Sequence, residues 1–158
     1  MGGITMEQDL LNTFDKELLL KDLCARLPYG VKMIDTEPYS AEHNPILTLS
    51  YISEDNCIGC RAGKGVMATS LGSIKPYLFP LSSMTEEQKK EISKRYNLHT
   101  HWICVEITNH SEGYWDDDSS CNLQDYLWLI DWFNKNHFDY RGLIEKGLAI
   151  DATGLNIY

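Results

Sequence analysis

Two pairs of residues have side chains of the types that bind zinc. Cys57 and Cys60 form a C-x-x-C motif, and His99 and His101 form an H-x-H motif in a segment that alternates like a strand. Converging thiolates and imidazoles hold Zn²⁺ in proteins. The two pairs are far apart in the sequence, and H-x-H is not the spacing of a closed zinc finger. We therefore expect free thiols and two sheet histidines. The alternative is a zinc site, which is structural if all four residues converge and can support hydrolysis if only some of them do and one position stays open.

A Gly-rich stretch at residues 59–65 superficially resembles a phosphate-binding loop. A P-loop needs a longer glycine spacing and a Ser or Thr after its lysine, and both are missing here. A Gly-rich hairpin is the better interpretation. Such a hairpin can still present basic side chains and backbone donors to an anion, with Tyr51 or Tyr77 available to stack on a base. The residues of this alternative site for an anionic ligand, such as a nucleotide signal, are Arg61, Gly63, Lys64 and Gly65.

The most distinctive part of the sequence is acidic and aromatic. Between Arg95 and Lys135 there are seven acidic residues, no Lys or Arg, and all four tryptophans. Three consecutive aspartates lie in this stretch, but without the alternating ligands and turn glycine of an EF-hand. Acidic side chains around large aromatics favour docking onto a basic protein partner. The residues predicted to contact that partner are Glu112, Tyr114, Trp115, Asp116, Asp117 and Asp118.

Composition excludes several classes of function. The chain has 158 residues and a net charge of −9, which argues against direct nucleic-acid binding and against binding to anionic membranes. No apolar run is long enough to span a bilayer, and nothing at the N-terminus resembles a signal peptide. Five cysteines, an odd number, indicate free thiols in a reducing cytoplasm. The length predicts one globular domain over residues 1–158, compatible with a monomer or a homo-oligomer.

Hydrophobic spacing predicts three helices. The first covers residues 5–27, with an apolar face of Leu11, Phe14, Leu18, Leu20, Leu23, Cys24 and Leu27, and Pro28-Tyr29-Gly30 ends it. The second is a charged surface helix, capped by Ser83 or Thr85, that runs to about Tyr96. The third begins at Asn122 and ends near Asn136, with an inward stripe of Leu123, Leu127, Ile130 and Phe133. Asp139 caps one further helical turn before Gly147.

Alternating segments predict the strands. They are residues 31–34, 46–52, 66–71, 74–79 and 98–107, with a turn at 53–56 and an acidic loop at 108–119. Helices at both ends and strands between them predict a single α+β domain. Its sheet is mostly antiparallel and packs against the N-terminal and C-terminal helices.

Three segments resemble a known group of proteins. They are residues 18–32 (LLLKDLCARLPYGVK), 74–92 (IKPYLFPLSSMTEEQKKEI) and 130–152 (IDWFNKNHFDYRGLIEKGLAIDA), a little over a third of the chain. In these segments the chain is similar to small uncharacterised proteins of Bacteroides-type gut bacteria, their phages and their mobile elements. The resemblance implies an accessory protein that works in a bacterial cytoplasm, and it implies no catalytic residues.

These observations favour a binding protein over an enzyme. No residue lies in a recognisable nucleophile elbow or catalytic cysteine context, so the sequence neither proposes nor excludes catalysis. We expect a non-enzymatic protein without a cofactor that binds a bacterial host protein through its acidic aromatic surface. Inhibition of a host defence system is the function that fits this surface and the phage context.

Overall fold

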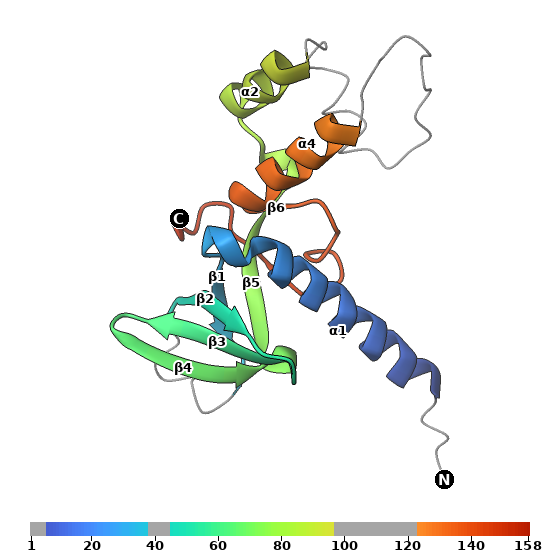
Figure 1. Ribbon diagram of the computed structural model, residues 1–158, viewed down its shortest axis with the longest axis vertical. Coiled ribbons are helices and arrows are strands. Elements are labelled where there is room, and N and C mark those ends of the chain that lie inside the picture. The colour runs from blue at the N-terminus through green and yellow to red at the C-terminus, as the bar shows by residue number, and fades with distance from the viewer. Residues whose placement is uncertain (1–5, 38–44, 97–122) are drawn as a thin grey trace.

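The computed structural model describes residues 6–37, 45–96 and 123–158 (Figure 1). The described helices are α1 (Met6–Arg26), α2 (Glu86–Tyr96) and α4 (Leu123–Lys135). The described strands are β1 (Lys32–Asp35), β2 (Leu47–Ile52), β3 (Cys57–Ala62), β4 (Gly65–Ser70), β5 (Ile74–Pro80), β6 (Phe138–Asp139) and β7 (Ile150–Asp151). None of these helices is both long and apolar enough to cross a membrane.

The seven strands form a sheet in the order β4-β3-β2-β1-β5-β6, and β7 also pairs with β5. Strands β1 to β5 are antiparallel to their neighbours in this order, whereas the two-residue strands β6 and β7 are parallel to β5. Helix α1 and helix α4 flank this sheet (Figure 1). The predicted α+β fold with a mostly antiparallel sheet is therefore confirmed.

Helix α1 ends where the sequence predicts. A 3-10 turn at Leu27–Tyr29 tightens the last turn of the helix, and Gly30 follows in the left-handed region with φ of 61°. A glycine adopts this conformation without steric strain, which lets the chain reverse into β1.

The Gly- and Cys-rich stretch contains a strand that the sequence analysis did not predict. Strand β3 pairs with β2 on one side and with β4 on the other. Residue Gly59 lies under the ring of Tyr51, so that an added Cβ would come within 2.1 Å of the ring atom Cε1. The residues that connect β3 to β4 are Gly63, with φ of 58°, and Lys64, so the predicted hairpin is confirmed. Glycine has low strand propensity, and pairing on both sides overrides it.

The larger core lies between α1 and one face of the sheet. Leu19 and Leu23 of α1 pack with buried residues of β1, β2, β3 and β5, among them Met33, Leu49 and Leu78. The predicted apolar face of α1 is partly wrong, because Phe14 and Cys24 are exposed. The helix face that is buried is the one that carries Leu19 and Leu23.

A second, smaller core joins α2, α4 and β6. Its buried residues are Met84, Ile92, Trp132, Phe133 and Phe138. The predicted inward stripe of α4 holds for Phe133, but Leu127 is 50% exposed and Ile130 is 37% exposed. The predicted buried face of α4 is therefore partly wrong. The helix is rotated about its axis relative to the prediction, so that the bulkier Trp132, together with Trp128 and Leu129, packs in this core.

Candidate functional site

The predicted partner-binding residues lie between helices α2 and α4 in the chain. Glu112, Tyr114, Trp115 and Asp116–Asp118 fall within 97–122, outside the described residues, as does the predicted strand 98–107. The segment follows α2, which ends at Tyr96, and precedes α4, which begins at Leu123. Helices α2 and α4 are therefore the described elements that flank this segment in the chain.

Helix α2 begins with a capping box. The backbone N–H of Thr85 donates to Gln88 Oε1 at 2.9 Å, and the backbone N–H of Gln88 donates to Thr85 Oγ1 at 3.3 Å. Two backbone donors that the helix cannot use internally are thus satisfied. The predicted cap at Thr85 is confirmed. The predicted surface position is also confirmed, except that Ile92 reaches into the second core.

Aromatic packing holds α4 against β6. The rings of Trp132 and Phe138 are stacked with centroids 5.6 Å apart, and Phe133 meets Phe138 edge-on at 6.3 Å. Such pairs contribute about 0.5–1.5 kcal/mol each beyond the area they bury. The inner face of α4 is therefore fixed, and its rotation about its own axis is fixed with it.

The two helices are also joined near the ends that flank the segment. The guanidinium of Arg95 on α2 lies over the ring of Trp128 on α4, with 5.6 Å from Cζ to the ring centroid. An exposed cation–π contact of this kind contributes about 0.5–1 kcal/mol. The helix that ends at Tyr96 and the helix that begins at Leu123 thus contact each other directly.

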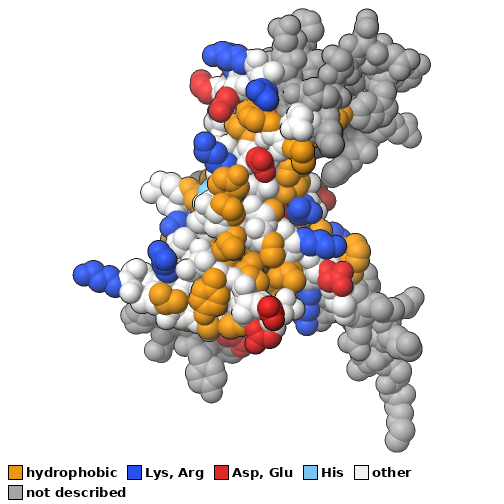
Figure 2. Space-filling model, in the orientation of Figure 1, with side chains coloured by type: hydrophobic (Ala, Val, Ile, Leu, Met, Phe, Trp, Pro, Cys, Tyr) orange, Lys and Arg blue, Asp and Glu red, His pale blue; other side chains and the backbone are white. Residues whose placement is uncertain are grey.

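The outward face of α4 is apolar. Tyr126 is 44% exposed, and it lies one turn before Ile130 and beside Leu127. Figure 2 shows hydrophobic side chains at the surface in this part of the molecule. Asp131, also exposed, adds a carboxylate to the same end of the fold. We call Tyr126, Leu127 and Ile130 the α4 outer face. Such a surface can contribute apolar contact area to a complex.

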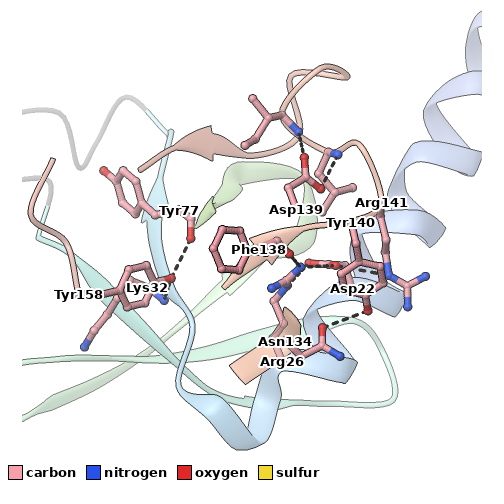
Figure 3. A network of polar contacts seen from close by, with 12 residues as sticks. Asp22, Arg26, Lys32, Tyr77, Asn134, Phe138, Asp139, Tyr140, Arg141 and Tyr158 are labelled. Carbon is pink, nitrogen blue, oxygen red and sulfur yellow. Dashed lines mark hydrogen bonds and ion pairs between the residues drawn. The ribbon is translucent and has the colours of Figure 1, made fainter. Parts of the chain in front are cut away.

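A buried ion pair that the sequence did not predict lies on α1, next to β6. Asp22 and Arg26 on α1 are both 0% exposed, and Arg26 Nε donates to Asp22 Oδ2 at 2.7 Å (Figure 3). Arg26 Nη2 also donates to the backbone oxygen of Phe138 at 2.7 Å. The guanidinium therefore ties α1 to β6, immediately after α4. The only sequence signal was an Asp–Arg pair four residues apart on a helix.

Further contacts extend this network back to α4. Arg141 Nε lies 3.4 Å from Asp22 Oδ1, an ion pair by distance without hydrogen-bond geometry. The Arg141 guanidinium also lies over the ring of Tyr140 at 5.0 Å. The hydroxyl of Tyr140 donates to Asn134 Oδ1 of α4 at 3.0 Å (Figure 3). The buried charges of α1 and the buried amide of α4 thus belong to one set of polar contacts.

The predicted capping role of Asp139 is confirmed in part, because Asp139 caps a hydrogen-bonded turn and not a helical turn. Its Oδ1 accepts from the backbone N–H of Leu143 at 2.9 Å, and its Oδ2 accepts from Ile144 at 2.8 Å. Gly147 closes the turn with φ of 70°. A buried carboxylate that binds two backbone donors fixes the chain after β6.

A second polar cluster surrounds Tyr158. Its hydroxyl donates to the backbone oxygen of Tyr77 at 2.8 Å and accepts from the backbone N–H of Lys32 at 3.0 Å. The ring stacks on His137 with centroids 3.9 Å apart. Burial lowers the pKa of His137 to about 4, and the charges of Arg26 and Lys32 act in the same direction. The imidazole is therefore neutral at pH 7.

The cysteines of the alternative zinc site do not point the same way. Cys57 and Cys60 are three residues apart on β3, so their side chains lie on opposite faces of the sheet. Both are free, Cys57 is half-buried, and burial raises the pKa of the Cys60 thiol. His99 and His101 lie outside the described residues. Within the described ranges no group of three His, Cys, Asp or Glu side chains is arranged to hold a metal ion.

The residues of the alternative anion site all lie on the β3–β4 hairpin. Arg61 is exposed on β3 opposite Val66, Lys64 is in the turn, and Gly63 and Gly65 flank Lys64. The ring of Tyr51 covers Gly59 on the same face of the sheet as Arg61. The anionic-ligand site stays a prediction.

Neither a family model, nor a curated protein, nor a solved structure matches this chain. The proposals below therefore rest on the sequence and on the geometry of the described residues.

Proposed function

We propose that the protein is a non-enzymatic binding protein that docks onto a basic protein partner through residues 97–122 and the α4 outer face. One observation carries this proposal. The acidic, aromatic stretch continues directly into a helix that exposes Tyr126, Leu127 and Ile130 on one side, while its other side is fixed in the second core.

The composition of this surface supports protein binding. Aromatic and aliphatic side chains supply contact area that water leaves on association, and tryptophan and tyrosine are frequent energetic anchors of interfaces. Trp115 and Tyr114 provide such anchors in the sequence, and the α4 outer face, which follows them in the chain, adds apolar area. The surrounding acids supply long-range attraction to a basic surface, which accelerates encounter.

The packing of α2 and α4 supports a defined binding geometry. The Arg95–Trp128 contact and the second core hold α2 and α4, the helices before and after residues 97–122 in the chain, against each other. The buried Arg26 of α1 donates to the carbonyl of Phe138, whose ring belongs to the second core, and so joins α1 to this core. Helices that are already ordered lose less entropy when a partner binds.

The charge pattern favours a partner that normally binds nucleic acid. Seven acids without a base resemble the charge of a phosphate backbone, and a basic nucleic-acid groove is the complementary surface. In the phage or mobile-element setting that the resemblance implies, such a partner is a host protein of the bacterial cytoplasm. Inhibition of a host defence component is the function that we propose for the complex.

Affinity capture from a bacterial host lysate tests this function. The three baits are the wild-type protein, the reversal of Glu112 and Asp116–Asp118 to Lys, and a matched control. The control reverses four exposed acids elsewhere, Glu17, Glu87, Glu91 and Glu145, and so carries the same net charge. We expect one specific partner with the wild-type and control baits and its loss with the first reversal. Equal recovery by all three baits would contradict the acidic-surface proposal.

A second variant separates the α4 outer face from the acids. Leu127→Ser with Ile130→Ser removes exposed apolar area and leaves the second core intact. We expect weaker recovery of the same partner, with an unchanged melting temperature. Undiminished recovery would remove α4 from the proposed interface.

A further inference from the structure

Strand β4 is the edge of the sheet, and its outer side faces no other strand in the described part of the chain. It pairs with β3 through six residue pairs, from Ala62↔Gly65 at the turn to Cys57↔Ser70 at the far end. The register is continuous, in contrast to the β2–β3 pairing, which shifts between Leu49 and Tyr51. A long, regular edge offers unpaired backbone groups to another strand.

The geometry of the hairpin identifies those groups. In a two-residue hairpin, the pair that closes the turn exchanges both hydrogen bonds, and bonded and non-bonded pairs then alternate. The backbone groups of Gly65, Met67 and Thr69 therefore point toward β3. Those of Val66, Ala68 and Ser70 point outward.

The usual features that prevent edge pairing are missing from β4. Exposed edges are commonly protected by charged side chains, prolines or bulges. The sequence of β4 is Gly-Val-Met-Ala-Thr-Ser, without a charge or a proline. Val66 is 65% exposed and Met67 is 40% exposed. The edge is thus apolar as well as regular.

Opposite charges lie at the two ends of the hairpin. Arg61 and Lys64 are at the turn between β3 and β4, and exposed Glu54 and Asp55 precede β3 at the other end. The hydroxyl of Ser53 donates to the carboxylate of Asp55 and lowers its pKa. Figure 2 shows a basic side chain projecting past the hairpin and acidic side chains at the opposite end of the sheet. An antiparallel copy of this hairpin would reverse the order of the charges.

We propose that β4 pairs with β4 of a second copy of this chain, antiparallel and centred on Ala68. Ala68 then lies opposite Ala68 of the second copy, and Val66 lies opposite Ser70. No like charges meet along the strands. The basic end of each hairpin lies at the same end of the dimer as the acidic end of the other. The two ends are about three strand spacings apart, or ~14 Å, so 0.1 M salt, with a Debye length of about 10 Å, screens most of this attraction.

This pairing is small and separate from the proposed partner-binding surface. A single pair of six-residue strands is at the low end of interface sizes, which predicts a reversible, concentration-dependent dimer. Strand β4 and helices α2 and α4 lie at opposite ends of the fold (Figure 1). Failure of either proposal therefore leaves the other standing.

Sedimentation analysis across a concentration series tests the dimer. Wild-type protein should shift from 18.1 kDa toward twice that mass as its concentration rises. Ala68→Lys and Ala68→Glu each place like charges at the two-fold axis, so each should remain monomeric, whereas an equimolar mixture should associate. Ala68→Pro removes the outward N–H without adding charge and should also remain monomeric. Thr153→Lys and Thr153→Glu, at an exposed site away from β4, should behave like the wild type.

The outcomes are distinct. Circular dichroism and melting temperature show whether each variant is folded, and only folded variants are compared. A wild-type protein that is monomeric throughout would overturn the proposal. Self-association of either Ala68→Lys or Ala68→Glu on its own would overturn it as well. So would an equimolar mixture of the two variants that stays monomeric.

Discussion

The buried ion pair of α1 gives the sharpest stability prediction. Asp22→Ala leaves the Arg26 guanidinium at 0% exposure with the Phe138 carbonyl as its remaining hydrogen-bond acceptor. Removing one partner of a buried pair destabilises a protein by about 3–5 kcal/mol, because the other charge stays desolvated. In a chain of this size 1 kcal/mol lowers the melting temperature by about 2–4 °C. We therefore expect a decrease of roughly 6–20 °C.

The chain supplies a matched control for this experiment. Glu86 and Lys89 form an ion pair at the same 2.7 Å separation, but on the surface of α2. Glu86→Ala should lower stability far less than Asp22→Ala, since water already solvates both charges. The assay is urea and thermal unfolding followed by circular dichroism. Equal losses for Asp22→Ala and Glu86→Ala would refute the reasoning.

A double variant tests the cause of the loss. Asp22→Ala with Arg26→Met removes both charges, so no unpaired charge remains in the core. The carbonyl of Phe138 then loses a donor, which costs about 1–3 kcal/mol. We expect the double variant to be more stable than Asp22→Ala alone. A double variant that is less stable than the single one would show that the buried charge is not the source of the loss.

Three further predictions concern α4, the neutral histidine and the cap after β6. Phe133→Ala should destabilise the protein by about 3–5 kcal/mol, whereas Leu127→Ser should change stability by less than about 0.5 kcal/mol; similar losses in urea unfolding would contradict the orientation of α4. Since the pKa of His137 is about 4 in the folded protein and 6.5 in the unfolded chain, the unfolded chain binds the extra proton first. The melting temperature should therefore fall as pH drops from 6.5 to 4. His137→Asn should reduce that fall, and asparagine tolerates the positive φ at this position. A pH profile that is the same in the variant and the wild type would contradict a neutral, buried His137. Asp139→Ala removes the acceptor of two backbone N–H groups and should cost about 2–4 kcal/mol in thermal unfolding; no loss would exclude this role.

Local rules predicted the elements that depend on nearby residues. The end of α1 follows from Pro28 and Gly30, the start of α2 from Thr85, and the turn after β6 from Asp139. Each of these is a hydrogen bond or a backbone conformation specified within five residues. The alternating strands were found for the same reason, because their period of two residues is itself a local signal.

Features that depend on distant contacts were not predictable. Asp22 and Arg26 read as ordinary surface residues until β6 and Tyr140 are packed against α1. The orientation of α4 depends on Ile92, which is remote in sequence from Leu127, and on Phe138, which lies outside the helix. Strand β3 contains few residues that favour strands and exists because β2 and β4 pair with it. In each case tertiary packing decides between local alternatives that are close in energy.

The candidate site shows the same division. The acidic, aromatic composition of residues 97–122 is visible in the sequence, and it predicts electrostatic attraction to a basic partner. The apolar face of α4, which follows this segment in the chain, was assigned to the core by its helical period, because Leu127 and Ile130 are spaced as core residues are. The structure places these side chains at the surface, where they enlarge the proposed interface.

The salt dependence of association with the captured host partner, measured by surface-based kinetics, tests the proposed acidic interface most directly. For the wild-type protein we predict an association rate that falls steeply as ionic strength rises. Reversal of Glu112 and Asp116–Asp118 should lower that rate at low salt and abolish its salt dependence. The control reversal of Glu17, Glu87, Glu91 and Glu145 should retain both. A wild-type association rate that is independent of salt, or equal for the two reversals, would contradict the proposal that this acidic surface recognises the partner.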